Sequence, residues 1–440
     1  MFLLEFSIVL LAMFIGARFG GIFLGMAGGM GVAVLAFGFG ITPTSPPMDV
    51  MLIIMAVVVA ASTLQAAGGM DYLVQIAEKL LRRNPERITF LAPFIAYAFT
   101  FCSGTGNVAY SILPVIAEVA RESGVRPERP ISISVIASQQ AITACPISAA
   151  TVTLLGLLSP FGITLIDIMM ICIPASLVAI FCGALYANRM GKKLELDEEY
   201  QRRIREGLIS PLPKRTEYAP ATKQAKISVL LFLLGALIVV LFGTFPSLRP
   251  VLDYSGKFAP LNMTHAIEIT MLTISAIMVI LCKVDVNKII DGSVFRSGSM
   301  GVICIFGLAW MGDSFVASQM GAIKQSVQEI VATQPWVFAI ALFAVSTLTL
   351  SQAATTRALM PLGIALGIPA PILISVFPSV NGYFFFPNYA TVIAGIAFDR
   401  TGTTRIGRFV LNHSYMMPGL ITSVTSVMFA LVLIKLYGLI

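Results

Sequence analysis

Two clusters of small and polar residues interrupt apolar stretches of the chain and could bind a small charged ligand. Residues 88–120 contain the run Ser103–Asn107, and residues 335–367 contain the run Ser351–Thr356. A helix that breaks in an apolar environment exposes N-terminal amide groups, which attract carboxylates, and C-terminal carbonyl groups, which attract cations. The hydroxyl and amide side chains of both runs can serve either ligand. In the alternative interpretation, they only satisfy the backbone groups that the interruption frees.

Two further apolar stretches are broken in a similar way. Residues 131–158 contain Ser138-Gln139-Gln140 and Pro146, and residues 369–398 contain Pro378–Gly382 and Pro387. The same two interpretations apply, with Gln140 weighed beside its neighbours. The candidate ligand-binding residues are Ser103, Gly104, Thr105, Asn107, Gln139, Ser148, Ser351, Thr355, Thr356, Arg357, Ser379, Asn381 and Asn388.

Arg357 is the strongest single candidate. It lies about ten residues from either end of its hairpin arm, or roughly 15 Å at 1.5 Å per residue, which is near the middle of a membrane. A charge at that depth is costly and indicates a functional site. A guanidinium also matches a carboxylate in a bidentate geometry. In the alternative interpretation, the side chain extends to the outer surface.

The composition excludes a soluble protein. Of the 440 residues, 57% are hydrophobic and only 12% are charged, whereas soluble domains carry about 25% charged residues. Six cysteines without a C-x-x-C pair and two histidines indicate neither a disulfide framework nor a metal site. Because the protease motifs H-E-x-x-H and G-x-G-D are also absent, we do not expect an enzyme.

Hydrophobic runs and charge predict the topology of an all-α polytopic membrane protein. Single spanning helices fit residues 2–17, 20–40, 49–67, 165–188, 227–246, 262–282, 294–312 and 409–437. With two broken spans, 131–158 and 369–398, the chain has ten transmembrane helices, and 88–120 and 335–367 become re-entrant hairpins. This topology places most of the 29 basic residues on one side. The positive-inside rule makes that side cytoplasmic, with both termini periplasmic.

The second half of the sequence repeats the first at a nearly fixed offset. Asp71 and Asp313 are 242 residues apart, and Ile133–Ser138 matches Ile374–Ser379 at an offset of 241. The position equivalent to Arg357 is Ala109 or Tyr110. Five spans in each unit invert the second unit in the bilayer, and inverted repeats with paired broken helices are typical of secondary transporters. We therefore expect a first repeat (residues 1–187), a cytoplasmic linker loop (188–226) and a second, inverted-topology repeat (227–440).

At several runs the chain resembles the anaerobic C4-dicarboxylate transporter (Dcu) family, on the branch of the aspartate, fumarate and succinate exchangers. The resemblance covers essentially the whole chain. It depends on the runs Ala60–Ala66, Ala77–Pro85, Cys102–Gly106, Arg126–Pro130, Val294–Gly298 and Phe398–Thr404.

This resemblance implies a bacterial inner-membrane carrier that exchanges C4-dicarboxylates, typically fumarate, malate or aspartate against succinate. We expect it to work by alternating access. A Na⁺- or H⁺-coupled dicarboxylate symporter is the alternative, and an anion channel is less favoured. A wider resemblance to ion-coupled carboxylate transporters implies possible Na⁺ binding at the hairpin tips and no other cofactor. The expected partners are the dicarboxylate substrates and the lipid bilayer, with a possible homo-oligomer and no nucleic acid.

Overall fold

The computed structural model describes residues 2–439 except 20–21, 47, 210–220, 255–256, 293, 297, 301, 304–305, 309, 316, 320–335, 350, 388 and 408–410. Within this part helices predominate, and the two strands form one antiparallel hairpin, β1 (Val251–Tyr254) with β2 (Lys257–Pro260). The expected all-α class is confirmed.

The first half of the chain contains nine helices in the described residues. They are α1 (Phe2–Phe19), α2 (Phe23–Ala33), α3 (Met48–Ala66), α4 (Gly69–Arg83), α5 (Ile88–Ser103), α6 (Ala109–Glu122), α7 (Glu128–Ala144), α8 (Ala149–Leu158) and α9 (Leu165–Ala187). A π-helical turn, Val34–Gly38, extends α2.

The second half of the chain follows α10 (Glu198–Arg205). Its helices with defined bounds in the described residues are α11 (Lys223–Thr244), α12 (Met263–Cys282), α13 (Val286–Asp291), α15 (Trp336–Thr349), α16 (Gln352–Ala365), α17 (Ala370–Val376), α18 (Ala390–Phe398) and α19 (Met416–Leu436). Residues 310–315 are also helical, and this stretch is called segment 310–315 below.

Several helices are long and apolar enough to cross a membrane. In the described residues these are α9, α11, α12, α19 and the 34-residue stretch Glu128–Phe161, and a sixth is the α3–α4 pair, bent by 71°, if it counts as one span. At 1.5 Å per residue, the 23 residues of α9 reach about 34 Å, which is enough for the hydrocarbon core. The ten-span topology stays a prediction. The helix expected from residue 409 begins only at Met416.

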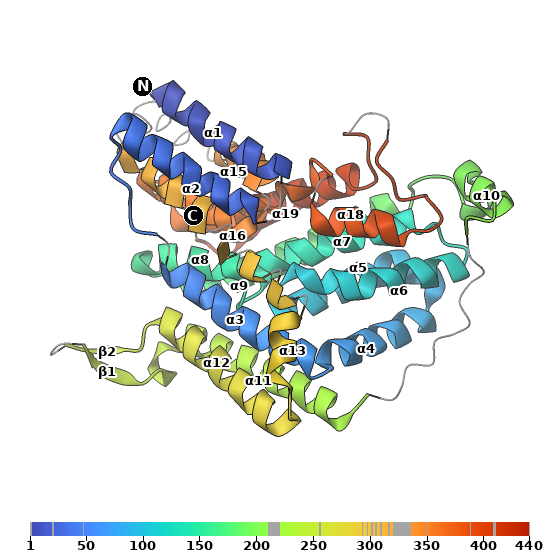
Figure 1. Ribbon diagram of the computed structural model, residues 1–440, viewed down its shortest axis with the longest axis horizontal. Helices are drawn as coiled ribbons and strands as arrows, with labels where there is room; N and C mark the ends of the chain where they lie inside the picture. The colour runs from blue at the N-terminus through green and yellow to red at the C-terminus, as the bar shows by residue number, and fades with distance from the viewer. Residues whose placement is uncertain are drawn as a thin grey trace.

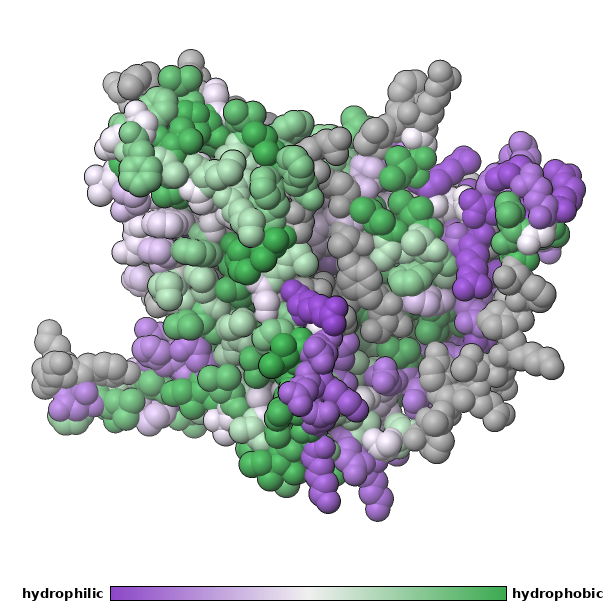
Figure 2. All heavy atoms as spheres, viewed as in Figure 1, coloured by the Kyte–Doolittle hydropathy of each residue, from purple (hydrophilic) through white to green (hydrophobic). Residues whose placement is uncertain are grey.

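Polar and apolar surfaces separate along the molecule. The two termini and the β1–β2 hairpin lie toward the left of Figure 1, and α10 lies at the opposite end. Hydrophilic residues gather over α10 and near α13, while the surface over α2 and α11 is largely hydrophobic (Figure 2). On α11, Leu230 is 68% exposed and Leu237 53%. Exposed leucines on a long helix are what a lipid-facing surface requires.

The buried hydrophobic side chains form several separate clusters. The central cluster draws on both halves of the chain and includes residues of α7, α8, α9, α16, α17 and α19. A second cluster joins α1 and α2 to segment 310–315, through Val9, Val32 and Met311. The core helices also cross between the halves, because α8 packs against α16, α18 against α6, and α9 against α19.

Part of the expected linker loop is docked on the rest of the protein. Arg126, which is only 4% exposed, forms ion pairs with Glu128 and with Asp197 of the loop. Burial raises the pKa of Asp197, but the Tyr200 backbone N–H and the Arg126 guanidinium outweigh burial and leave the pKa below its usual value. The docking therefore contributes stability at neutral pH, and that contribution is lost when acid protonates Asp197.

Candidate functional site

The first hairpin ends in a tip that packs on the break between α7 and α8. Gly104 closes α5 with a φ of 72°, a left-handed conformation that glycine adopts without strain. A Cβ atom at Gly104 would stand 3.0 Å from Ile147 Cγ1, in the break itself. The Cys145 thiol donates to the Phe101 carbonyl (3.0 Å). The tip and the break thus fit together without room for larger side chains.

The second hairpin packs in a comparable way on the break that follows α17. The chain leaves α17 through the 3₁₀ turn Phe377–Val380, passes Asn381 and enters a second 3₁₀ turn, Gly382–Phe384. The Gly382 backbone N–H donates to Ser346 Oγ of α15 (2.8 Å). Each of the two predicted hairpins therefore lies against the broken helix of its own half.

Four amide side chains connect these two assemblies at the centre of the protein. Gln352 Nε2, at the start of α16, donates to Gln139 Oε1 (2.9 Å) and to Asn381 Oδ1 (3.1 Å). Asn381 Nδ2 donates to Gln140 Oε1 (3.1 Å) and to the Pro378 carbonyl (3.1 Å). We call Gln139, Gln140, Gln352 and Asn381 the amide cluster.

The amide cluster is buried and has unused hydrogen-bond donors. Gln139 and Gln140 are 0% exposed, Asn381 1% and Gln352 6%. Among the described residues, neither Gln139 Nε2 nor Gln140 Nε2 has a hydrogen-bond partner. Leaving a buried donor unpaired costs about 1–3 kcal/mol. These two amide groups carry four N–H donors, and an ionised carboxylate has about four acceptor sites, so the cluster suits a carboxylate ligand.

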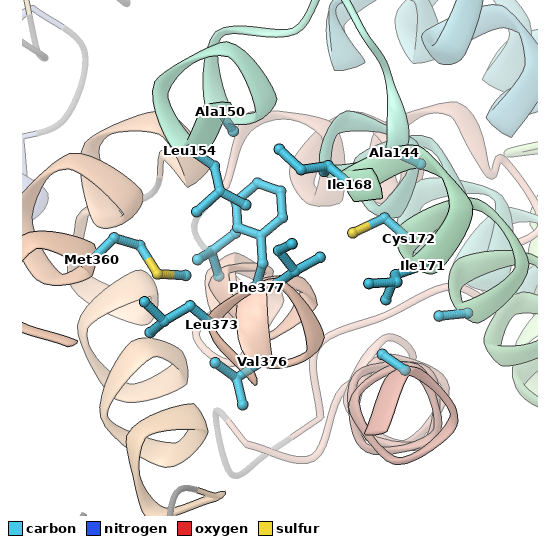
Figure 3. Close-up of a cluster of buried hydrophobic side chains, with 14 of the residues drawn as sticks. Ala144, Ala150, Leu154, Ile168, Ile171, Cys172, Met360, Leu373, Val376 and Phe377 are labelled. Carbon is cyan, nitrogen blue, oxygen red and sulfur yellow. The ribbon is translucent and has the colours of Figure 1, made fainter. Parts of the chain in front are cut away.

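Apolar side chains of both halves surround the broken helix beside the cluster. Figure 3 shows Phe377, from the 3₁₀ turn after α17, among Leu154 of α8, Ile168 of α9 and Met360 of α16. All four belong to the central cluster and are fully buried. Apolar side chains exclude water, and a hydrogen bond to a ligand is stronger where water is excluded.

Most of the predicted hydroxyls bind the backbone of their own turn. Ser148 Oγ accepts from the Thr151 backbone N–H and caps α8, and Ser351 Oγ caps α16 in the same way. The other hydroxyl donors bind nearby carbonyls: Ser103 that of Thr105 (3.2 Å), Thr355 that of Ser351 (2.9 Å), Thr356 that of Gln352 (2.7 Å) and Ser379 that of Val376 (2.6 Å). These contacts favour the structural interpretation of the hydroxyls. Asn388 and the side chain of Asn107 lie outside the part of the chain that is described.

Arg357 stands apart from the amide cluster. Its Nε donates to Asp313 Oδ2 at 3.1 Å, and the two side chains are 26% and 16% exposed. The sequence alone favours an N-cap role for Asp313 at the start of an interfacial helix, but the structure places it within helical segment 310–315. Arg357 therefore has an anionic partner already.

The list of candidates from the sequence lacks three residues that the structure brings into the site, Gln140, Gln352 and Gly106. Gln352 lies in a run that the sequence singled out, yet it was not among the candidates. Gly106 has no side chain, but a Cβ atom there would stand 2.3 Å from Gln139 Nε2. A signal for Gln140 was present, because Asn381 follows it by 241 residues, the offset of the repeat.

Comparisons with known proteins cover the whole chain. A family described as "Anaerobic c4-dicarboxylate membrane transporter" matches residues 1–438. The C4-dicarboxylate transporter DcuA of Wolinella succinogenes is 44% identical over 421 residues, which are 96% of each chain. DcuA of Escherichia coli K12 is 44% identical over 98% of this chain and 99% of the relative. The anaerobic C4-dicarboxylate transporter DcuB of Escherichia coli O6:H1 is 39% identical over 100% of this chain and 99% of the relative.

Proposed function

Because this chain belongs to the anaerobic C4-dicarboxylate membrane transporter family, we propose that it exchanges one C4-dicarboxylate for another across the bacterial inner membrane by alternating access. The family consists of transporters and not of enzymes. The substrates that we propose are fumarate, malate, aspartate and succinate, and the amide cluster is their binding site.

The unused donors of the amide cluster are the observation that carries this proposal. Gln139 and Gln140 present buried N–H groups that a carboxylate can accept. The cluster also joins Gln139 and Gln140 of the first half to Gln352 and Asn381 of the second. A ligand held there contacts both halves at once, so its binding can respond to a movement between them.

The contacts between the halves support an inverted repeat. Asn381 and Gln140 are 241 residues apart and hydrogen-bonded to each other. The packing also has a reciprocal pattern, since α8 contacts the hairpin arm α16 and α18 contacts the hairpin arm α6. A two-fold axis in the plane of the membrane would produce both features, and it is the symmetry that alternating access uses in many secondary transporters.

Exchange suits the charges of the site. Fumarate, malate and succinate each carry two negative charges at neutral pH, whereas the amide cluster is neutral and Arg357 is paired with Asp313. Exchange of one dianion for another moves no net charge and requires no coupling ion. Within the described residues, no group of three or more His, Cys, Asp or Glu side chains could hold a metal ion. Sodium coupling through backbone carbonyls at the hairpin tips remains the competing mode.

Efflux from proteoliposomes tests the proposal. Vesicles that contain the purified protein are loaded with labelled succinate and diluted into buffer with or without fumarate, in the absence of an ion gradient. Obligatory exchange predicts rapid loss of label only with fumarate outside. Equal rates in the two buffers would exclude exchange and leave a uniporter or a channel. In a second assay, a sodium gradient or a pH gradient is imposed. Efflux into fumarate-free buffer that appears only with such a gradient would indicate the symporter.

A further inference from the structure

Arg357 and Asp313 connect parts of the protein that are packed separately. Segment 310–315 shares its hydrophobic cluster with α1 and α2, through Met311 and Phe315. Helix α16 contributes Ala354 and Met360 to the central cluster instead. The Arg357–Asp313 ion pair therefore crosses a boundary between two hydrophobic cores.

The boundary itself is lined by small residues. A Cβ atom on Gly312 would stand 3.3 Å from Ala358 Cβ, so segment 310–315 and α16 meet there with little side-chain interlocking. Segment 310–315 is held on its other side by the stretch before α3, because Trp310 Nε1 donates to the Thr44 carbonyl (2.6 Å) and the Thr44 backbone N–H donates to Ser314 Oγ (3.1 Å). A smooth contact bridged by one ion pair can separate without disturbing either core.

The ion pair has no equivalent in the first half of the chain. Asp71, at the position equivalent to Asp313, is exposed in the first turn of α4. At the offset of 242 the position equivalent to Arg357 is Val115, and aligning Ser103 with Ser351 makes it Ala109; neither residue is charged. The repeat architecture thus does not require the pair. Its presence in only one half of the chain points to a role in transport.

Arg357 and the amide cluster lie on the same helix but face different neighbours. Gln352 contacts Gln139 and Asn381, whereas Arg357, five residues further along α16, contacts segment 310–315. At 3.6 residues per turn, five residues correspond to about 140° around the helix axis. Asp313 binds through Nε, and a guanidinium has five N–H donors in all. A carboxylate that reaches Arg357 therefore finds further N–H donors and can compete with Asp313 for it.

We propose that the Asp313–Arg357 ion pair is a latch that keeps the substrate-free protein from reorienting, and that a substrate carboxylate opens it by replacing Asp313 on Arg357. This inference rests on the proposed exchange function. Without substrate, separating α16 from segment 310–315 leaves a half-buried guanidinium without an anion, which is costly. With substrate bound, Arg357 keeps an anionic partner, while the Asp313 carboxylate is hydrated by water. The loaded protein therefore changes conformation and the empty one does not, which is the requirement for obligatory exchange.

The test compares efflux of labelled succinate into buffer with and without fumarate for the wild type and three variants. We expect the ratio of the two rates to exceed tenfold in the wild type. Asp313→Asn should raise efflux into substrate-free buffer by tenfold or more and bring the ratio close to one, while exchange with fumarate persists. Asp313→Glu keeps the charge and should retain coupling. Glu206→Gln removes a carboxylate from an exposed ion pair with Arg202 and should change neither rate.

Each result separates the latch from the proposed function. A wild-type ratio near one contradicts exchange itself. If the wild type is coupled and Asp313→Asn is equally coupled, exchange stands and the latch is wrong. Loss of all transport in Asp313→Asn, with a normal size-exclusion profile in detergent, would also contradict the latch, because the pair would then be needed for transport itself. Coupling lost in Asp313→Glu but kept in Asp313→Asn would overturn the proposed charge dependence.

Discussion

Substitution of Gly106 by alanine should weaken substrate binding without unfolding the protein. The added Cβ atom would stand 2.3 Å from Gln139 Nε2, 2.8 Å from Gln139 Cδ and 2.9 Å from Gln139 Oε1. These three atoms are the free end of a flexible side chain, so the amide group can move and the backbone need not. Restoring an ordinary separation requires a displacement of about 1 Å, since packed carbon atoms lie about 3.5–4.0 Å apart.

That displacement affects the amide cluster directly. The hydrogen bond from Gln352 Nε2 to Gln139 Oε1 measures 2.9 Å, and a lengthening of about 1 Å takes it beyond hydrogen-bond range. The free Gln139 Nε2 donor is displaced as well. An interaction of this kind is worth about 1–3 kcal/mol when one partner is lost, which corresponds to a loss of affinity of about 5-fold to 140-fold.

Uptake of labelled succinate over a range of concentrations measures this effect as a rise in the apparent Km. Gly156→Ala is the matched control: Gly156 is a helical glycine of α8, and a Cβ atom there meets nothing within 4 Å. The control should leave uptake unchanged, and its thermal stability should be equal or slightly higher, because alanine favours a helix by up to about 1 kcal/mol over glycine. An unchanged Km in Gly106→Ala, with the control behaving as expected, would remove Gln139 from the binding site.

Three further predictions concern the site, the topology and the linker. Gln140→Leu and Asn381→Leu should each lower uptake by about tenfold, and the double variant should be little worse, because the two side chains share one hydrogen bond; additive losses would contradict a common site. In a cysteine-free background, Leu208→Cys and Phe258→Cys, at positions that are 61% and 77% exposed, should react with an impermeant reagent from the cytoplasm and the periplasm respectively. Labelling of both from one side would refute the proposed topology. Arg126→Ala should cost about 3–5 kcal/mol, as removal of one partner from a buried ion pair does, and should speed proteolysis of the linker; equal cleavage rates would show that the pair does not hold the loop.

The interruptions of the helices were predictable from the sequence, but the roles of their side chains were not. Glycine, proline and hydroxyl residues inside apolar runs mark a broken helix because of local backbone chemistry, and the structure breaks the helices at Gly104, after Ala144 and at Asn381. Whether a hydroxyl at such a break binds a ligand or its own turn depends on its rotamer. The hydroxyls of Ser148 and Ser351 each accept a hydrogen bond from a backbone N–H of their own helix.

Partners that are far apart in the sequence were the least accessible to prediction. Arg357 was predicted to need an anion, and this follows from a charge at membrane depth. Its contact with Asp313 depends on how α16 is rotated and on which helix packs beside it, and neither is encoded in the local pattern. Gln352 was overlooked for a similar reason, because a single glutamine at the start of a helix carries no sign of the two amides, Gln139 and Asn381, that bind it.

The hydrogen bond between Gln140 and Asn381 restricts which side chains those two positions can carry. In an inverted repeat, a residue that touches its own equivalent lies on the rotation axis, so it faces a copy of its own position. If both positions carry the same kind of side chain, that side chain must be self-complementary, able to donate and accept at once. An amide meets this condition, whereas an arginine or a carboxylate would meet a like charge. If the two halves form the proposed inverted repeat, an arginine at one of these positions would need a different residue at the other, whereas Arg357 lies away from this contact and belongs to one half alone.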